Sequence, residues 1–412
     1  MPRDGVPSQL MLRQAMILCG GSGTRLGSLT AATPKPLLTV GGRPFLDVLL
    51  HELGRHGITD VVLLAAFEAE QVDQYITDNP VARRFGIRLR VSVEPERAGT
   101  GGAVFHARDM GDKQFLLLNG DSWFDINLLG IATAGHAPEQ AADVVMTIRE
   151  IEDASRYGVV EMDGGRVTDF FERPRGPGPG LVNAGIYRVR DSIFASLQPK
   201  CSFERDVLPS LARSGRVAGV RRSGYFIDIG MPETFARAQV EIPAQQRRKA
   251  VFLDRDGVLN QDLGYVGSVD RFQWTDDACE AVRALNDAGY FVFIVTNQAG
   301  VARGLYTEHD VATLHAHIDQ ELAAAGAHLD AKRYCPYHAD AKLKHYRQAS
   351  DWRKPAPGML LDLMSEWDVD RDQSHMIGDQ PTDIEAGRAS GVAAHRFPGG
   401  NLLSFVRGLG LV

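Results

Sequence analysis

Residues 249–266 read KAVFLDRDGVLNQDLGYV, and this stretch opens the second half of the chain. Its apolar start predicts a buried strand that ends at the acid Asp254. Asp256 follows two residues later, so in an extended segment both carboxylates point the same way. Two acids facing one site suit a nucleophile and a general acid/base, with a divalent cation relieving their repulsion. An isolated pair of this kind is more often structural, so further residues must decide.

Composition limits the class of protein. A chain of 412 residues is too long for one ordinary core, and its 44% hydrophobic and 24% charged residues are usual for a soluble protein. The net charge of −7 gives no reason to expect nucleic acid or an anionic membrane as partner. We find no transmembrane run and no secretion signal. Four widely spaced cysteines indicate a reducing cytoplasm, and a homo-oligomeric state is left open.

Two regions of the chain alternate apolar, strand-length runs with helix-period segments. The first begins at Ala15 and the second at residue 249, and this alternation is typical of α/β domains. Between them, residues 242–248 (IPAQQRR) have no apolar periodicity and suggest a linker. We therefore expect domains at 1–241 and 249–412, joined by a linker at 242–248.

The first domain carries a glycine loop, GGSGTRL, directly after its first apolar run, and PKP follows at 34–36. Glycines let the backbone approach a ligand and turn N–H groups toward phosphate oxygens. The loop lacks the lysine of a Walker A motif, and Leu26 replaces the third glycine of a Rossmann turn. The cations Arg25 and Lys35 favour triphosphate chemistry over the alternative of a simple tight turn.

GGSGTRL followed by PKP resembles the signature of sugar-1-phosphate nucleotidyltransferases, over the chain to about residue 240. The resemblance implies a Rossmann-like domain with a mixed sheet, in which Arg25 and Lys35 hold the triphosphate. It also implies that Asp121 in LLLNGD and Asp228 in GYFIDIG bind Mg²⁺ or Mn²⁺, which suits their hard oxygen ligands. The alternative for each acid is that it caps a turn.

The same resemblance assigns nucleotide and sugar contacts. Those for the nucleotide are Gly20, Gly21, Gly23, Thr24, Gly99 and Thr100. Those for the sugar phosphate are Glu172, Arg173 and Asn183, with arginine where the family often has lysine. PKPLLTVGGRPFLDVLL, SFERDVL and GYFIDIGMPETFARAQ are similar to the branch that guanylylates heptose 1-phosphate, which implies GTP as substrate. Enzymes for mannose or glucose 1-phosphate share this frame and remain an alternative.

The second domain has four more polar positions after its acid pair. Thr296 ends the apolar run FIVT, Lys354 lies in RKPAPGM, Asp379 ends SHMIGD, and Asp383 follows four residues later. This order, over residues 249–397, resembles the haloacid dehalogenase (HAD) superfamily. The resemblance implies a second Rossmann-like domain that hydrolyses phosphomonoesters.

The resemblance also implies a role for each residue. Asp254 attacks phosphorus, and Asp256 protonates the leaving oxygen and then activates water. Thr296 and Lys354 bind the phosphoryl group. Mg²⁺ or Mn²⁺ is held by Asp254, the Asp256 carbonyl and Asp379, with support from Asp383.

Closer matches narrow the substrate. DRDGVLNQDLGYV, VTNQAGVARGLYTE and CPYH…RKPAPGM are similar to heptose-1,7-bisphosphate 7-phosphatases, with histidinol-phosphate phosphatases as near relatives. Arg303 and the pair Asn297-Gln298 would then recognise the substrate. The alternative for Arg303 is an ordinary surface arginine.

The two resemblances together imply consecutive steps. A 7-phosphatase would leave heptose 1-phosphate from an α-anomeric heptose 1,7-bisphosphate, and a guanylyltransferase would join it to GMP from GTP, releasing pyrophosphate. One alternative is a phosphatase for histidinol phosphate. Another is an N-terminal sugar-nucleotide sensor, although a sensor has no need of the acids Asp121 and Asp228.

Residues 335–355, CPYHADAKLKHYRQASDWRKP, invite a metal interpretation. The related bisphosphatases often hold a structural zinc here with Cys-x-His and Cys-x-Cys. This chain retains Cys335, but the other three positions are Tyr337, Ser350 and Trp352. Because a structural zinc needs four soft or borderline ligands, we expect a zinc-free loop held by packing of Tyr337 and Trp352.

Overall fold

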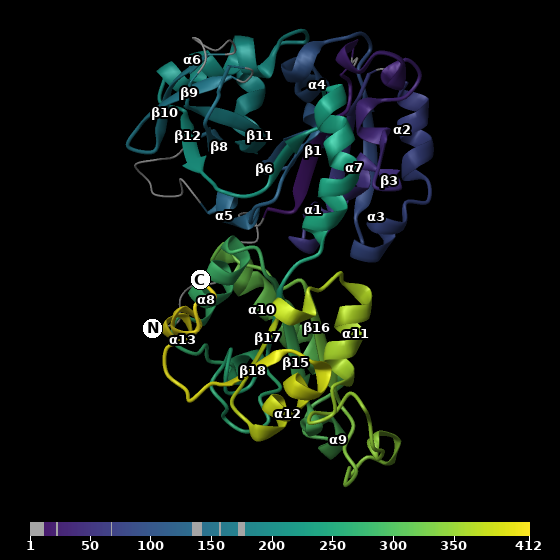
Figure 1. Ribbon diagram of the computed structural model, residues 1–412, viewed down its shortest axis with the longest axis vertical. Helices are drawn as coiled ribbons and strands as arrows, with labels where there is room; N and C mark the ends of the chain where they lie inside the picture. The colour runs from purple at the N-terminus through teal and green to yellow at the C-terminus, as the bar shows by residue number, and fades with distance from the viewer. Residues whose placement is uncertain (1–11, 22–23, 67, 134–141, 156–157, 172–177) are drawn as a thin grey trace. The chain divides into compact units, whose positions relative to one another are not determined.

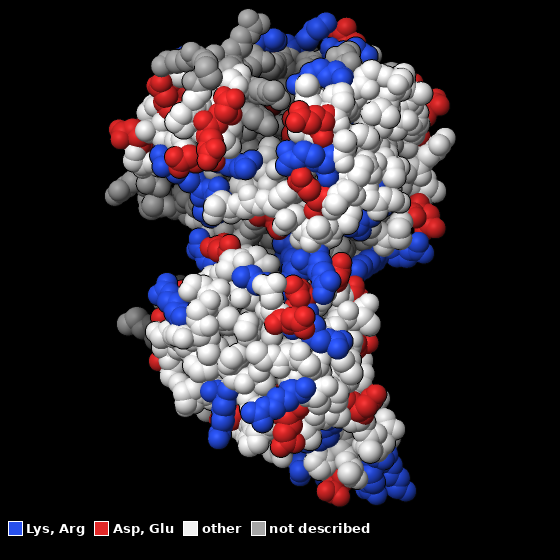
Figure 2. Space-filling view, viewed as in Figure 1, with Lys and Arg blue, Asp and Glu red and all other residues white. Residues whose placement is uncertain are grey.

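The computed structural model describes residues 12–21, 24–66, 68–133, 142–155, 158–171 and 178–412. The chain folds into two compact α/β units that divide between Ala244 and Gln245 (Figure 1). On the face drawn in Figure 2, basic and acidic side chains are interspersed over each unit. No helix of the described residues is both long and apolar enough to cross a membrane.

A mixed nine-stranded sheet forms the first unit, in the order β5-β4-β1-β6-β11-β8-β12-β10-β9. The four strands from β5 to β6 are mutually parallel, and β11 is antiparallel to both β6 and β8. The strands are β1 (Gln14–Leu18), β4 (Asp60–Ala65), β5 (Arg88–Val93), β6 (Gln114–Asn119), β8 (Val144–Ile151), β9 (Val159–Asp163), β10 (Arg166–Phe171), β11 (Gly180–Arg190) and β12 (Val217–Arg221).

Helices cover this sheet, and the strand pattern explains why. Ala15 and Ile17 pack in one apolar core whereas Met16 packs in another, so β1 is buried on both faces. The α-helices are α1 (Phe45–Arg55), α2 (Ala69–Ile76), α3 (Pro80–Phe85), α4 (Gly99–His106), α5 (Leu129–Ala132), α6 (Leu208–Arg213) and α7 (Pro232–Gln246). Short strands pair as β2 (Thr39–Val40) with β3 (Arg43–Pro44), and β7 (Ser122–Phe124) with β13 (Phe226–Asp228).

The two units divide within the segment 242–248 that the sequence suggested as a linker, although much of that segment is helical. Helix α7 continues to Gln246 and includes Pro243. Ile242 is only 1% exposed and belongs to a core of the first unit. Ala238 and Ile242, the two buried residues of α7, lie four positions apart on one face of the helix, and only Ile242 falls within 242–248, so that segment alone carries no apolar period.

The second unit is built on a parallel five-stranded sheet in the order β16-β15-β14-β17-β18. Its strands are β14 (Ala250–Leu253), β15 (Phe291–Asn297), β16 (Ala331–Cys335), β17 (His375–Gly378) and β18 (Ala393–Arg396). Its α-helices are α8 (Ala278–Asp287), α9 (Ala299–Arg303), α10 (Glu308–Ala324), α11 (Gly358–Glu366), α12 (Pro381–Ser390) and α13 (Leu402–Gly408). Val251 and Leu253 face one core, and Phe252 packs on Phe293. Because β14 is central, groups that follow it meet groups from both neighbours at the carboxyl edge.

Candidate active sites

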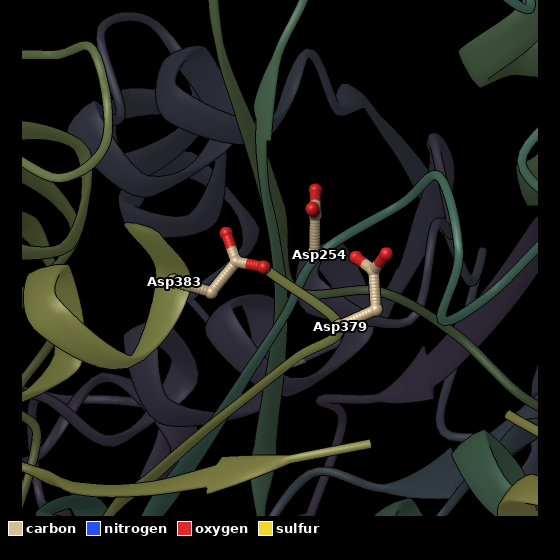
Figure 3. Close-up of side chains that lie close together, drawn as sticks. All are labelled: Asp254, Asp379 and Asp383. Atoms are coloured by element: carbon tan, nitrogen blue, oxygen red, sulfur yellow. The ribbon is translucent and has the colours of Figure 1, made fainter. Parts of the chain in front are cut away.

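Three acids gather at the carboxyl edge of the second sheet (Figure 3). Asp254 follows β14, Asp379 follows β17, and Asp383 lies in the first turn of α12. One carboxylate oxygen of each lies within 4.8 Å of the other two. The register of β14 with β17 places Asp254 and Asp379 at the same edge of the sheet. Leu253 pairs with Ile377, and the Asp254 N–H donates to the Ile377 carbonyl at 3.0 Å.

This cluster suits a divalent cation. Burial raises the pKa of Asp254 to about 7, and burial also raises the pKa of Asp379. Asp379 Oδ1 is buried and has no hydrogen-bond partner among the described residues. Clustered, buried carboxylate oxygens with an unused lone pair are what Mg²⁺ or Mn²⁺ would neutralise.

A buried lysine faces the same acids. Lys354 is 2% exposed, and its Nζ lies 3.0 Å from Asp254 Oδ1 and 2.7 Å from Asp383 Oδ1. Burial by itself would lower the pKa of Lys354, but the two carboxylates outweigh it and the pKa is raised. A permanent ammonium at this place can neutralise a phosphoryl group that joins Asp254.

Asn297 holds the backbone of that lysine. Its Oδ1 accepts the Lys354 N–H and its Nδ2 donates to the Lys354 carbonyl, both at 3.1 Å. Both ends of the amide are thus engaged inside the protein. Contact of Asn297 with a substrate stays a prediction, whereas its contact with Lys354 is a feature of this structure.

Asp256 lies beside this cluster in a dense set of donors. Its Oδ1 accepts from Asn260 Nδ2 at 3.0 Å, and Arg255 Nη2 donates to both oxygens at 2.9–3.0 Å. Its Oδ2 also accepts from Gln298 Nε2 at 2.9 Å. Arg255, Asn260 and Gln298 therefore fix this carboxylate, and neither Arg255 nor Asn260 was singled out by the sequence.

Other predicted substrate contacts lie further out. Arg303 is exposed at the end of α9, with its guanidinium 5.6 Å from the centre of the Tyr265 ring. A cleft of about 550 Å³ opens beside Asp379. It is lined by Gly257, Asp379, Gln380, Arg396, Phe397, Pro398 and Gly399. Of the acid cluster, only Asp379 lines this cleft.

Hydrogen bonds hold the loop at 336–353. Tyr346 and Tyr334 donate to the two carboxylate oxygens of Glu308 at 2.7 and 2.6 Å. The ring of Tyr337 lies 6.0 Å from that of Tyr346, and Arg353 donates to the Tyr337 carbonyl at 3.3 Å. Tyr337 thus contacts the loop through its ring and its carbonyl, and the part of Glu308 was not foreseen; packing of the loop by Tyr337 together with Trp352 stays a prediction. The absence of zinc stays a prediction.

In the first unit, Lys35 and the two predicted metal acids come together. Lys35 is buried, and its Nζ lies 2.7 Å from Asp121 Oδ2. The pairing of β7 with β13 places Asp228 opposite Ser122, and the Ile229 N–H donates to the Asp121 carbonyl at 2.9 Å. Burial, followed by the charge of Asp121, raises the pKa of Asp228. A divalent cation beside this acid pair would relieve both effects.

The nucleotide loop is described in part. Arg25 is exposed, its charge acts on Asp228, and its Nη1 lies 3.7 Å from Met231 Sδ. Gly20 passes so close to Glu94 and Ala66 that a Cβ there would lie 2.9 Å from Glu94 Oε1. Gly21 has open space around it, and Thr24 begins the short helix Thr24–Thr30. Predictions at Gly23, Glu172 and Arg173 lie outside the described residues.

Gly99 and Thr100 open helix α4 against the segment that includes SFERDVL. The backbone of Gly99 has φ +79°, and a Cβ there would lie 2.6 Å from the Cys201 carbonyl oxygen. The Thr100 hydroxyl donates to Glu204 Oε2 at 2.6 Å and accepts the Phe203 N–H at 2.8 Å. The Thr100 hydroxyl therefore has two hydrogen-bond partners inside the protein, and its contact with a nucleotide stays a prediction.

Asn183 lies where the β11 ladder changes register against β8, between Asn183 and Tyr187. Its Oδ1 accepts the Gly185 N–H at 3.0 Å, and its Nδ2 donates to the Tyr187 hydroxyl. Gly185 has φ +74° and abuts the Asn119 side chain, so the irregular strand approaches the end of β6. A sugar contact for Asn183 stays a prediction.

The fold and the two acid clusters define an enzyme with two sites for phosphate chemistry, one in each unit. A nucleotidyl transferase family model matches residues 14–245, and a HAD-hydrolase-like model matches residues 351–396. The chain belongs to the nucleotidyl transferase family over its first unit and carries a HAD-type phosphatase domain in its second.

Named relatives match each unit separately. The chain is 48% identical over 161 residues to a D-glycero-β-D-manno-heptose-1,7-bisphosphate 7-phosphatase from Rhodopseudomonas palustris, covering 39% of this chain and 89% of the relative. It is 34% identical over 224 residues to a D-glycero-α-D-manno-heptose 1-phosphate guanylyltransferase from Campylobacter jejuni, covering 54% and 96%. The crystal structure of HddC from Yersinia pseudotuberculosis matches with a TM-score of 0.50 and 30% identity, covering 56% and 100%. These matches confirm both family resemblances.

Proposed function

We propose that the chain makes a GDP-heptose from a heptose 1,7-bisphosphate in two consecutive reactions. The second unit would remove the 7-phosphate, and the first unit would transfer GMP from GTP to the remaining 1-phosphate. The observation that carries the proposal is that one chain joins a unit similar to a heptose 1,7-bisphosphate 7-phosphatase with a unit similar to a heptose 1-phosphate guanylyltransferase, because removal of the 7-phosphate leaves a heptose 1-phosphate. Small-molecule substrates also suit the partly buried acid groups of both units.

In the phosphatase reaction, a carboxylate oxygen of Asp254 forms a bond to phosphorus as the bond to the sugar O7 breaks. Asp256 gives its proton to that oxygen, and the heptose 1-phosphate leaves. Water then attacks the aspartyl phosphate, Asp256 takes a proton from it, and inorganic phosphate and free Asp254 result. Lys354 and Thr296 neutralise and hold the phosphoryl oxygens throughout.

In the transferase reaction, a phosphate oxygen of the heptose 1-phosphate bonds to the α-phosphorus of GTP, and the bond to the β-phosphate bridging oxygen breaks. Pyrophosphate leaves with that electron pair, so no proton donor is required. Lys35 and Arg25 would balance the negative charge of the triphosphate. In this structure the Lys35 ammonium faces Asp121. Preference for GTP over other nucleotides is part of this proposal.

Each site would hold Mg²⁺ or Mn²⁺. In the second unit the ligands would be Asp254, Asp379 and the Asp256 carbonyl, with Asp383 beside them; in the first they would be Asp121 and Asp228. The bound cation would supply charge neutralisation at the phosphate oxygens. The oxygen-only donor sets and the raised pKa of Asp228, Asp254 and Asp379 support this assignment.

The sugar anomer follows from the chemistry at C7. The phosphatase relative is named for the β-bisphosphate, whereas the guanylyltransferase relative is named for the α-1-phosphate. Hydrolysis at C7 leaves C1 untouched, so the anomer that enters the first reaction also enters the second. If the two units serve one route, the phosphatase of this chain must therefore accept the α-bisphosphate.

The test is to incubate the protein and Mg²⁺ with the α- or β-heptose 1,7-bisphosphate and each nucleoside triphosphate in turn. Mass spectrometry then identifies the products. We expect GDP-heptose, phosphate and pyrophosphate from the α-anomer with GTP. Phosphate release only from the β-anomer, or only from histidinol phosphate, would contradict the consecutive route. Transfer to mannose or glucose 1-phosphate in preference to heptose 1-phosphate would contradict the sugar.

A further inference from the structure

Gln298 occupies the buried junction between β15 and α9. It is 1% exposed, and its backbone N–H donates to the Cys335 carbonyl at 2.8 Å, which ties the junction to β16. Its side chain lies between two residues with roles in the phosphatase reaction, Asp256 and Thr296. Because the Gln298 side chain is buried and contacts both of these residues, any effect on the reaction passes through them.

The Gln298 amide has all its hydrogen-bonding positions filled. Nε2 donates to Asp256 Oδ2 and to Thr296 Oγ1, each at 2.9 Å. Oε1 accepts from the Tyr306 hydroxyl at 2.6 Å and from Arg255 Nη2 at 3.2 Å. A guanidinium can only donate, so Arg255 requires the oxygen on its side and leaves the NH₂ group for Asp256. The amide orientation is thus determined by its partners.

Tyr306 is seated in a space that only glycine leaves open. A Cβ at Gly267 or at Gly300 would lie 2.2 Å from an atom of the Tyr306 ring. Neither glycine has a positive φ, so the ring rather than the backbone angle explains both residues. Burial raises the pKa of Tyr306 to about 12, and the hydroxyl remains a donor at neutral pH. The ring and its O–H are therefore held in one place.

We infer that Gln298 is a positioning residue, oriented by Tyr306, that sets the carboxylate of Asp256 for proton transfer to and from the reacting oxygen. The inference rests on the proposed phosphatase function. Asp256 needs one defined orientation in both half-reactions, and Gln298 links it to Thr296, which holds the phosphoryl group. Asn260 donates to the other oxygen of the same carboxylate, and Arg255 donates to both oxygens.

The decisive experiment compares leaving groups. Gln298→Met keeps the length of the side chain and removes both donors. We expect the rate of phosphate release from heptose 1,7-bisphosphate to fall roughly 100-fold with little change in KM, because proton transfer by a positioned group contributes about 10²–10⁴-fold. The burst of nitrophenol from p-nitrophenyl phosphate should change less than about threefold, since that leaving group departs without a proton.

Tyr306→Phe provides a second, milder variant. The Gln298 amide would lose one of its orienting donors, and we expect a fall of about three- to tenfold on the sugar substrate with the burst again retained. The matched control is Tyr334→Phe, which also deletes a 2.6 Å phenol-to-acceptor bond, but to Glu308. That control should leave both measurements within about twofold of the wild type.

Combination with Asp256→Asn tests the mechanism of action. If Gln298 acts through Asp256, Gln298→Met should cause less than about twofold further loss in the Asp256→Asn background. An equal loss on both substrates in the single variant, or a full additional loss in the double variant, would overturn the inference. If the wild-type protein releases phosphate from neither ester, the proposed phosphatase function fails, and this inference fails with it.

Discussion

The acid cluster of the second unit leaves no room for a Cβ atom at position 257. Gly257 has φ +89°, and a Cβ at this position would lie 2.6 Å from Asp379 Oδ2. Glycine is therefore required twice, by the backbone angle and by the carboxylate packed against it. Asp383 uses its two carboxylate oxygens for different contacts. Its Oδ2 accepts the Gln380 N–H at 3.0 Å at the start of α12, while its Oδ1 faces Lys354.

The first prediction concerns that glycine. Gly257→Ala should raise the Mg²⁺ concentration needed for half-maximal phosphate release at least tenfold, because Asp379 must move. Gly264→Ala is a matched control, since Gly264 has φ +70° and no described heavy atom within 4 Å of its Cβ position. The control should show only the backbone strain, about 1 kcal/mol of stability. Equal Mg²⁺ dependence for the two variants would contradict the packing argument.

At the scale of elements, the loop at 336–353 is tied to the start of α10. Glu308 is the first residue of that helix and accepts from Tyr334 and Tyr346. Acceptance of these two hydrogen bonds lowers the pKa of Glu308, so the carboxylate stays ionised near neutral pH. These two hydrogen bonds join β16, the loop and α10 through side chains.

We predict that Tyr346→Phe lowers the Tm of the second unit by a few degrees, because an exposed, charge-assisted hydrogen bond contributes about 1–2 kcal/mol. Elemental analysis of protein purified without metal-chelate steps should find no stoichiometric zinc, and chelation followed by restored Mg²⁺ should leave Tm unchanged. Zinc at one equivalent, lost together with stability, would show that the loop was misinterpreted. Ser210→Ala on α6 of the first unit should leave this transition unchanged.

A histidine pair joins β17 to β18. His375 Nδ1 lies 3.0 Å from His395 Nε2, and burial lowers the pKa of both rings. Lys249 and the partner ring lower the pKa of His375 further. Burial penalises the charged form of each ring, so the folded state disfavours protonation of this pair.

The lowered pKa of both histidines determines how the stability of the second unit depends on pH. The unfolded histidines bind protons near their ordinary pKa of about 6.5, whereas the folded pair binds them only at lower pH. Stability of the second unit should therefore be complete above about pH 7 and fall as the pH drops through 6.5. His395→Gln should weaken this dependence between about pH 7 and pH 5, as measured by urea unfolding. The exposed His309→Gln should not, and an unchanged slope in His395→Gln would contradict the prediction.

For the whole molecule, each of the two units brings together its own set of candidate residues. Lys35, Asp121 and Asp228 belong to the first unit, while Asp254 and Lys354 belong to the second. The two reactions should therefore be separable by substitution.

Asp254→Asn should abolish phosphate release and leave GMP transfer to supplied heptose 1-phosphate within about twofold, because only the nucleophile of the second unit is lost. Lys35→Ala should do the reverse, reducing GMP transfer by 100-fold or more through loss of a cation at the triphosphate. Parallel assays for phosphate and pyrophosphate measure both activities in each variant. Loss of both activities in a folded single variant would refute independent sites.

The sequence by itself determined the two families, the α/β class and the short list of reacting residues. These properties depend on local patterns, namely apolar runs that end in acids and a glycine loop with nearby cations. The comparisons confirmed the families, while the roles of the individual residues stay predictions. The division between the units falls within 242–248, as the sequence suggested, but no sequence pattern indicated that helix α7 continues to Gln246.

Only the tertiary structure decided what lies behind the reacting groups. Gln298 was expected to contact the substrate, and Arg255 and Tyr306 were not singled out. Arg255 and Gln298 meet because the parallel strands β14 and β15 bring their carboxyl ends to one edge of the sheet, and Tyr306 contacts Gln298 there. In the same way, Asn297 and Thr100 were expected to face ligands, but the fold gives their polar atoms partners inside the protein. A buried hydrogen bond depends on which distant atom comes within 3 Å, and a linear pattern carries no such distance.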